Sequence, residues 1–311
     1  MMLGRVFAIA MNTYREAVRA RVLFGLMAAA LAASAYSLVI ASMSIRQEMR
    51  IVADIGSASI SGFAVLVAII LGATSLYREL ELKTVFPILT RQLRRHEYVI
   101  GKYLGILAVL LAFVAIDGAA VLAIIALQSK VHVGSTLGVI GSLFLVLGVG
   151  LWRAKLHRVF VVLPWAVCAF IAMAVISHGA GPERQLIIVS SLLTLAEVAI
   201  VTAIAMLFSS FSSPFLTAIF TVMVFLIGRS ADMLGNLPVR VFGETLRSFG
   251  IFLSKVFPNL HVYVPARPVL LGQVPNVALP SYVLGAWGNA ILYAVVLLAV
   301  SAIVFRRRDF Q

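Results

Sequence analysis

Apolar and polar residues alternate along this chain in long blocks rather than position by position. Eight apolar blocks are long enough for a helix to cross a bilayer core of about 30 Å. They lie at residues 22–42, 56–76, 103–127, 135–151, 159–177, 185–208, 214–233 and 283–305. The pattern predicts an all-α integral membrane protein, a polytopic helical bundle of about eight spans.

The block at 135–151 has the weakest claim to be a span. It is the shortest of the eight and is rich in glycine, although glycine is well tolerated where membrane helices pack closely. If this block does not cross the membrane, the block at 159–177 cannot cross it either, and six spans remain. The basic segment "WRAKLHR" between the two blocks favours eight spans, because it reaches the cytoplasmic side only if both of them cross.

Two further segments predict helices that lie along a membrane surface. In residues 5–21, small and apolar side chains fall on one side of a helix and most charged side chains fall on the other. The apolar side consists of Val6, Ile9, Ala10, Thr13 and Ala17. We interpret the segment as an amphipathic N-terminal helix on the inner leaflet, the alternative being a cluster of charges that merely flanks the first span.

The second such segment lies within the long polar stretch at 234–282. Its apolar residues follow the alternating spacing of three and four positions that one helix face requires. These residues are Phe242, Leu246, Phe249, Leu253 and Val256. We expect a helix on the outer leaflet, ended by Pro258.

Composition and charge support a membrane protein and set its direction. Apolar residues make up 62% of the 311 residues and charged residues only 12%, outside the range of soluble domains. The net charge of +13 does not indicate a nucleic-acid partner, because the basic residues lie in short loops between apolar blocks. Most of the 25 Lys and Arg residues fall on the side of the N-terminus, which predicts a multi-pass protein of the cytoplasmic (inner) membrane with both termini in the cytoplasm.

The sequence offers no constellation for catalysis. Gly101 and Lys102 form its only Gly-Lys pair, but Tyr103 follows them and His96 stands where a phosphate-binding loop needs its first glycine. The histidines are too far apart for a metal site, and we expect Cys168 to be a packed, inert thiol. The prediction is a chain that is not an enzyme and binds no cofactor itself.

Two acidic residues lie inside predicted spans, Asp117 in the third and Glu197 in the sixth. An ionised carboxylate costs several kcal/mol at that depth, so each residue should face protein or a wet cavity. They are candidates for an intramembrane path for a substrate or a proton. A protonated carboxyl group that is hydrogen-bonded to a neighbouring helix is an equally good explanation.

The charged loop at 77–102 carries a recognisable pattern. The stretches "YRELELKT" and "ILTRQLRRHEYVIGKYLG" resemble the cytoplasmic loop of type-2 ABC exporter permeases, whose pattern is E-x-E-x-G-T, then L-L-S-x-P-x-S-R, then G-K. The matching residues are Glu79, Glu81, Thr84, Leu89, Arg95, Gly101 and Lys102. Lys83, Gln92 and Arg94 depart from the pattern, where the family has glycine, proline and serine.

Other stretches are similar to the same family in order along the chain. They are "MNTYREAVRARVLFGL", "LFSSFSSPF", "VFPNLHVY" and the closing "VFRRRDF". The last two resemble the subfamily of copper-processing, gliding and multidrug permease subunits. The helix pair at 135–177 has no counterpart in the six-helix core of the family, so we interpret it as an insertion.

The resemblance implies two permease subunits, identical or related, that work with two separate ATP-binding subunits carrying ATP and Mg²⁺. A coupling helix around 92–97 would dock on the ATPase and pass its closure to the spans. The residues expected there are Arg91, Gln92, Arg94, Arg95, His96 and Glu97, which offer charge-assisted contacts. Glu79 and Glu81 could pair with these arginines or with the N-terminal helix, as structural ion pairs or in transmission.

Three functions follow from this interpretation. The first is the membrane-spanning subunit of an ABC exporter that acts as a dimer in contact with membrane lipid. The second is a non-transporting scaffold or assembly subunit with the same fold and ATPase partner. A stand-alone carrier is third, since the chain lacks the internal repeat with broken helices that such carriers have.

Overall fold

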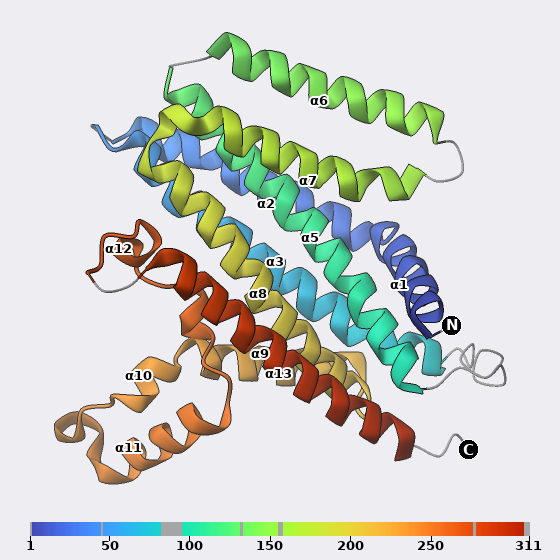
Figure 1. Ribbon diagram of the computed structural model, residues 1–311. Coiled ribbons are helices and arrows are strands. Elements are labelled where there is room, and N and C mark those ends of the chain that lie inside the picture. Colours follow the sequence, from blue (N-terminus) through green and yellow to red (C-terminus); the bar gives the residue numbers. More distant parts are fainter. Residues whose placement is uncertain are drawn as a thin grey trace.

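The computed structural model describes residues 2–44, 46–81, 95–130, 133–154, 158–275 and 278–307 (Figure 1). All regular elements within these residues are helices. In chain order they are α1 (Met2–Val18), α2 (Arg21–Ser42), α3 (Glu48–Glu81), α5 (Arg95–Gln128), α6 (Val133–Arg153), α7 (Arg158–Ile176), η1 (Ser177–Ala180), α8 (Pro182–Ser209), α9 (Pro214–Arg229), α10 (Ala231–Gly235), α11 (Val239–Val256), η2 (Leu260–Tyr263), α12 (Arg267–Leu270) and α13 (Leu279–Arg307).

Within the described residues, seven helices are long and apolar enough to cross a membrane: α2, α3, α5, α6, α7, α8 and α13. They confirm an all-α, multi-pass membrane protein and include both helices at 135–177. The remaining predicted span, 214–233, forms the shorter α9 of 16 residues and, after Ser230, the five-residue α10. Proline at the first helical position starts both α8 and α9, where its missing N–H leaves no helical bond unmade.

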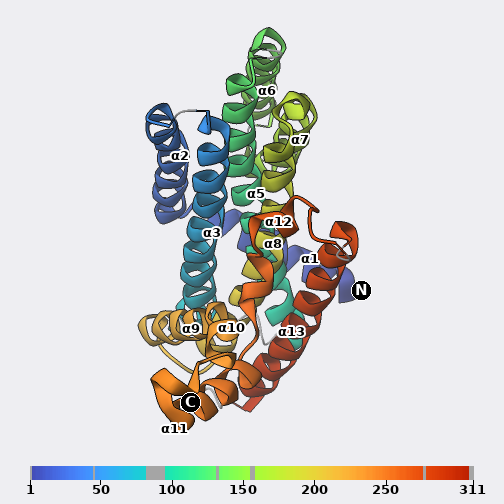
Figure 2. The same cartoon turned by 90° about the vertical axis from the view of Figure 1, so that its left-hand side faces the viewer.

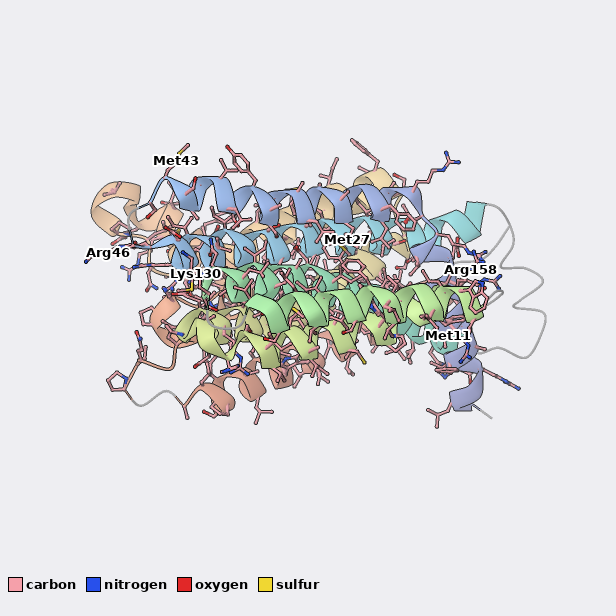
Figure 3. The ribbon with its side chains drawn as sticks, turned by 90° about the horizontal axis from the view of Figure 1, so that it is seen from above. Met11, Met27, Met43, Arg46, Lys130 and Arg158 are labelled. Carbon is pink, nitrogen blue, oxygen red and sulfur yellow. The ribbon has the colours of Figure 1, made fainter. Side chains whose placement is uncertain are left out.

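The bundle has two distinct ends. Met11 and Arg158 lie at one end, and Met43, Arg46 and Lys130 lie at the other (Figure 3). The first turn of α1 and the last turn of α13 both lie at the end that holds Met11 (Figure 1). We call this the N-terminal end; α3 finishes and α5 begins there. These two helices have 34 residues each, which is about 51 Å of helix against a bilayer core of about 30 Å.

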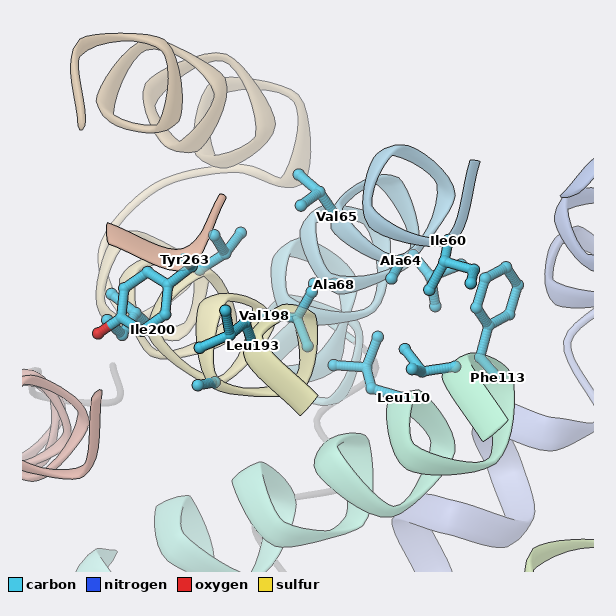
Figure 4. Close-up of a cluster of buried hydrophobic side chains, with 14 of the residues drawn as sticks. Ile60, Ala64, Val65, Ala68, Leu110, Phe113, Leu193, Val198, Ile200 and Tyr263 are labelled. Carbon is cyan, nitrogen blue, oxygen red and sulfur yellow. The ribbon is translucent and has the colours of Figure 1, made fainter. Parts of the chain in front are cut away.

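The centre of the bundle is formed by α3, α5 and α8, whose mutual contacts bury them on several sides (Figure 2). Their apolar side chains interlock in one continuous core, part of which is drawn in Figure 4. Labelled there are Ile60, Ala64, Val65 and Ala68 of α3, Leu110 and Phe113 of α5, Leu193, Val198 and Ile200 of α8, and Tyr263 of η2. The non-helical segment around η2 therefore reaches the core, where protein rather than lipid surrounds its backbone.

The pair α6 and α7 lies at the edge of the bundle, with α6 outermost (Figure 1). The indole N–H of Trp165 on α7 donates a hydrogen bond of 2.8 Å to the carbonyl oxygen of Leu143 on α6.

The sequence interpretation of Cys168 is wrong: its side chain is exposed on α7, not packed. An apolar block alone does not tell which face of a peripheral helix points outward.

The N-terminal helix α1 forms as predicted, but its small and apolar side packs on protein. Thr13, Tyr14 and Ala17 are buried where α1 crosses α5. The large apolar side chains of α1 that are exposed are those of Leu3 and Phe7. The predicted face is therefore the face that contacts α5, and different residues are available to the membrane surface.

Helix α11 forms in the segment predicted to lie on the outer leaflet. It ends at Val256, ahead of Pro258, and is kinked at Gly243, whose φ of 75° is accessible to glycine at little cost. A Cβ atom at Gly250 would lie 2.5 Å from the carbonyl oxygen of Leu234, so this side of α11 packs on α10. Leu246 and Phe249 remain exposed, as a helix with one face in a membrane surface requires.

Candidate functional site

The predicted coupling loop is only partly within the described residues. Thr84, Arg91, Gln92 and Arg94 lie outside them. Glu79 and Glu81 belong to the last turns of α3, and Arg95 is the first residue of α5. The remaining predicted residues, His96, Glu97, Gly101 and Lys102, all lie in the first turns of α5.

Two glycines of α5 allow α1 to pack unusually close to it. A Cβ atom at Gly101 would lie 2.7 Å from Cβ of Ile9, and one at Gly105 would lie 2.5 Å from the carbonyl oxygen of Ala10. Both distances are far below contact distance, so no larger residue fits without moving α1. The Gly-x-x-x-Gly spacing puts both gaps on one face of α5, as in close-packed membrane helices. Gly101 thus has a structural reason to be glycine.

Polar contacts join the same helices at the same end. Glu97 is 3% exposed, and its carboxylate lies 4.0 Å from the guanidinium of Arg5 on α1. Lys102 is equally buried, and its Nζ donates a hydrogen bond of 2.7 Å to the carbonyl oxygen of Ser75 on α3. Thus α1, α3 and α5 are tied together where the loop leaves the bundle.

The N-terminal helix is also joined to α7. The hydroxyl group of Tyr14 donates a hydrogen bond of 3.2 Å to the carbonyl oxygen of Val159, and its ring stacks on Phe160 with centroids 6.2 Å apart. Burial raises the pKa of Tyr14 to about 12, so the hydroxyl group stays protonated and remains a donor. The N-terminal helix is therefore held on two sides.

Asp117 is completely buried on α5. The Ser34 hydroxyl of α2 donates a hydrogen bond of 3.0 Å to its Oδ1 atom. Its Oδ2 atom has no hydrogen-bond partner among the described residues. One neutral donor does not offset the free energy of burying an ionised carboxylate, so this surrounding favours the neutral carboxyl group.

Glu197 is completely buried on α8 but has a charged partner. Arg229, the last residue of α9, donates a hydrogen bond to its Oε1 atom and forms an ion pair with it. The Ser61 hydroxyl of α3 donates to its Oε2 atom at 3.3 Å. The guanidinium of Arg229 also lies over the ring of Phe225, 5.7 Å from its centroid. One carboxylate thus joins three helices.

A third set of ionic contacts joins helices at the end of the bundle opposite the N-terminal end. Arg267 of α12 donates to Asp54 of α3 and to Glu183 of α8. These contacts hold α12 against two central helices, α3 and α8.

Sequence reasoning missed the partners of the acids rather than the acids themselves. Arg229 lies near the end of the apolar block at 214–233, and neither it nor Ser34, Ser61 or Arg267 was predicted as a partner. A signal for Arg229 was present: it lies 15 residues after Pro214, where α9 begins, and Glu197 lies 12 residues before Ser209, where α8 ends. That spacing indicates a cross-helix pair in a hairpin.

Within the described residues, no group of three or more His, Cys, Asp or Glu side chains is placed to hold a metal ion.

No protein-family model matches the chain, and no curated protein sequence is significantly similar to it.

Proposed function

We propose that the chain is the membrane-spanning permease subunit of an ATP-binding-cassette exporter. Two copies, or this chain and a related one, form the translocation path, and separate ATPase subunits bind ATP and Mg²⁺ and drive the change between inward and outward access. The proposal rests on the resemblance of the loop motifs and on the construction of the bundle at the end where that loop leaves it.

The observation that carries the proposal is the close contact of α1 with α5. Gly101 and Gly105 bring the two helix backbones together without intervening side chains, and the contacts of Glu97 and Lys102 add α1 and α3 to the same unit. A force applied to the loop by a docked ATPase would therefore displace α1, α3 and α5 together. This rigidity is what transmission of force from a docked ATPase needs.

The length of α3 and α5 supports the same role. Both helices are longer than a bilayer core requires, and the last residues of α3, 77–81, follow the apolar block at 56–76 and include three charged residues in sequence. An extension of this kind would carry the loop away from the membrane surface, where a soluble subunit can reach it.

The test is whether an ATP-binding subunit co-purifies with this chain from native membranes. Reversing the charges in the variant Arg94→Glu with Arg95→Glu should remove the ATPase while the permease stays in the membrane. Arg46→Glu with Arg50→Glu, at the opposite end of the bundle, is the matched control and should retain the ATPase. Undiminished ATPase with the first variant would contradict docking at this loop.

A second measurement separates transport from a mechanical role. Vesicles with the reconstituted complex should accumulate substrate only with ATP, and Gly105→Leu should abolish this accumulation while the ATPase still co-purifies. The leucine side chain would displace α1, so docking and transmission are tested by different variants. ATP hydrolysis without accumulation of any substrate class would favour the scaffold.

A further inference from the structure

The turn between α1 and α2 covers an apolar groove between α2 and α3. The groove has a volume of about 280 Å³. It is lined mainly by Val22, Leu23 and Leu26 of α2 and by Val67, Ile70 and Leu71 of α3. Figure 2 shows α2 beside α3 at the edge of the bundle, and Val22 is 54% exposed. The groove therefore opens toward the lipid.

The groove adjoins a second cavity at the N-terminal end. This smaller cavity of about 70 Å³ shares Ala20, Leu71 and Thr74 with the groove and is also lined by Glu16 and Lys102. The groove along α2 and α3 is lined almost entirely by apolar residues, whereas the charged side chains lie in the smaller cavity under the turn. An acyl chain with a charged headgroup at one end has the same order of apolar and charged parts.

The charge around the turn is strongly positive. Residues 13–21 contain three arginines, Arg15, Arg19 and Arg21, which are all exposed, and one acidic residue, Glu16. Helix α2 begins at the turn with no side-chain cap, since its N-cap residue is an alanine. Its first N–H groups and the positive end of its dipole add to the attraction for an anion.

We infer that this groove binds an anionic glycerophospholipid of the bilayer. One acyl chain lies between α2 and α3, and the phosphate group lies at the turn, against Arg19, Arg21 and the N-terminus of α2. From Thr74 to Val67 the groove follows α3 for about 10 Å at 1.5 Å per residue, most of the depth of one leaflet's hydrocarbon, about 15 Å.

The bound lipid stabilises the turn between α1 and α2. It fills the space between α2 and α3 beside the hydrogen bond of Lys102 with Ser75, so it stiffens the attachment of α1 to the bundle. The inference concerns the bilayer alone and holds whether or not the chain transports a substrate.

Native mass spectrometry of the full chain tests the site, with phosphatidylglycerol and phosphatidylcholine supplied in equal amounts. The unmodified chain should retain one phosphatidylglycerol molecule in preference to phosphatidylcholine. Arg19→Gln with Arg21→Gln should lower phosphatidylglycerol occupancy roughly tenfold to thirtyfold, as expected for two basic residues at a membrane surface. Arg153→Gln with Arg158→Gln, two exposed arginines at the turn between α6 and α7, is the matched control and should leave it unchanged.

Two substitutions of Leu26 test the groove itself. Leu26→Trp fills it and should abolish lipid retention, whereas Leu26→Ala widens it and should preserve retention. Comparing the two separates loss of the site from loss of folding, because the alanine variant removes more native packing. Equal occupancy by both lipids, retention by Leu26→Trp, or a lipid-free dimer that covers the groove would overturn the inference.

Discussion

Asp117 and Glu197 are both completely buried carboxyl groups on the neighbouring central helices α5 and α8, yet their surroundings differ. Asp117 has one hydroxyl donor from α2, and Glu197 has an arginine from α9 and a hydroxyl donor from α3. The first arrangement suits a neutral acid and the second a charged one. A buried acid in a span therefore does not reveal its charge state until the helix that supplies its partner is known.

The largest effect should follow from removing the cation of the charged site. Arg229→Met would leave Glu197 buried without a counter-ion, which lowers the free energy of unfolding by about 3 to 5 kcal/mol. Thermal unfolding in detergent should show a large fall in the midpoint. The double variant Glu197→Gln with Arg229→Met should recover most of the loss, and failure to recover it would show that Arg229 acts mainly through packing.

A smaller effect is expected when only the acid of this pair is neutralised. Glu197→Gln keeps the shape and the acceptor for Ser61, but it weakens the charge-assisted bond from Arg229, whose side chain is 30% exposed and can reach water. The expected loss is about 1 to 3 kcal/mol. A loss as large as that of Arg229→Met would show that leaving Arg229 unpaired costs as much as leaving Glu197 unpaired.

The smallest effect should come from the same amide change at the other site. Asp117→Asn replaces a neutral carboxyl group by a group of the same shape that still accepts from Ser34, so the stability change should stay below about 1 kcal/mol. Ser34→Ala is the matched control and should lower stability by about 1 kcal/mol, because it removes the donor. A large loss of stability in Asp117→Asn would instead mean that the buried acid is charged. Preserved stability with reduced transport would make Asp117 functional.

The helices followed from the sequence because apolar blocks of spanning length have few other structures available in a bilayer. Helix ends depend on neighbouring residues in the sequence. Examples are the starts of α8 at Pro182 and α9 at Pro214 and the end of α11 before Pro258. By contrast, the side of α1 that lies on protein depends on the gaps at Gly101 and Gly105, two features of a helix distant in sequence.

The candidate site was predictable only in part for the same reason. Buried acids stand out in an apolar block, so Asp117 and Glu197 could be found. Their partners could not be assigned by composition, since Ser34 is an ordinary residue in its helix and Arg229 resembles a charge that ends a span. Pairing depends on how helices cross, which a hydrophobicity pattern does not contain.

The shortness of α9 has a consequence for the membrane around it. Its 16 residues extend about 24 Å, less than an average bilayer core of about 30 Å, and short helices are accommodated by a thinner bilayer or by flanking side chains that stretch to the interface. Arg229 cannot stretch outward while it is bound to Glu197. We therefore expect a thicker membrane to weaken the contact between Glu197 on α8 and Arg229 on α9.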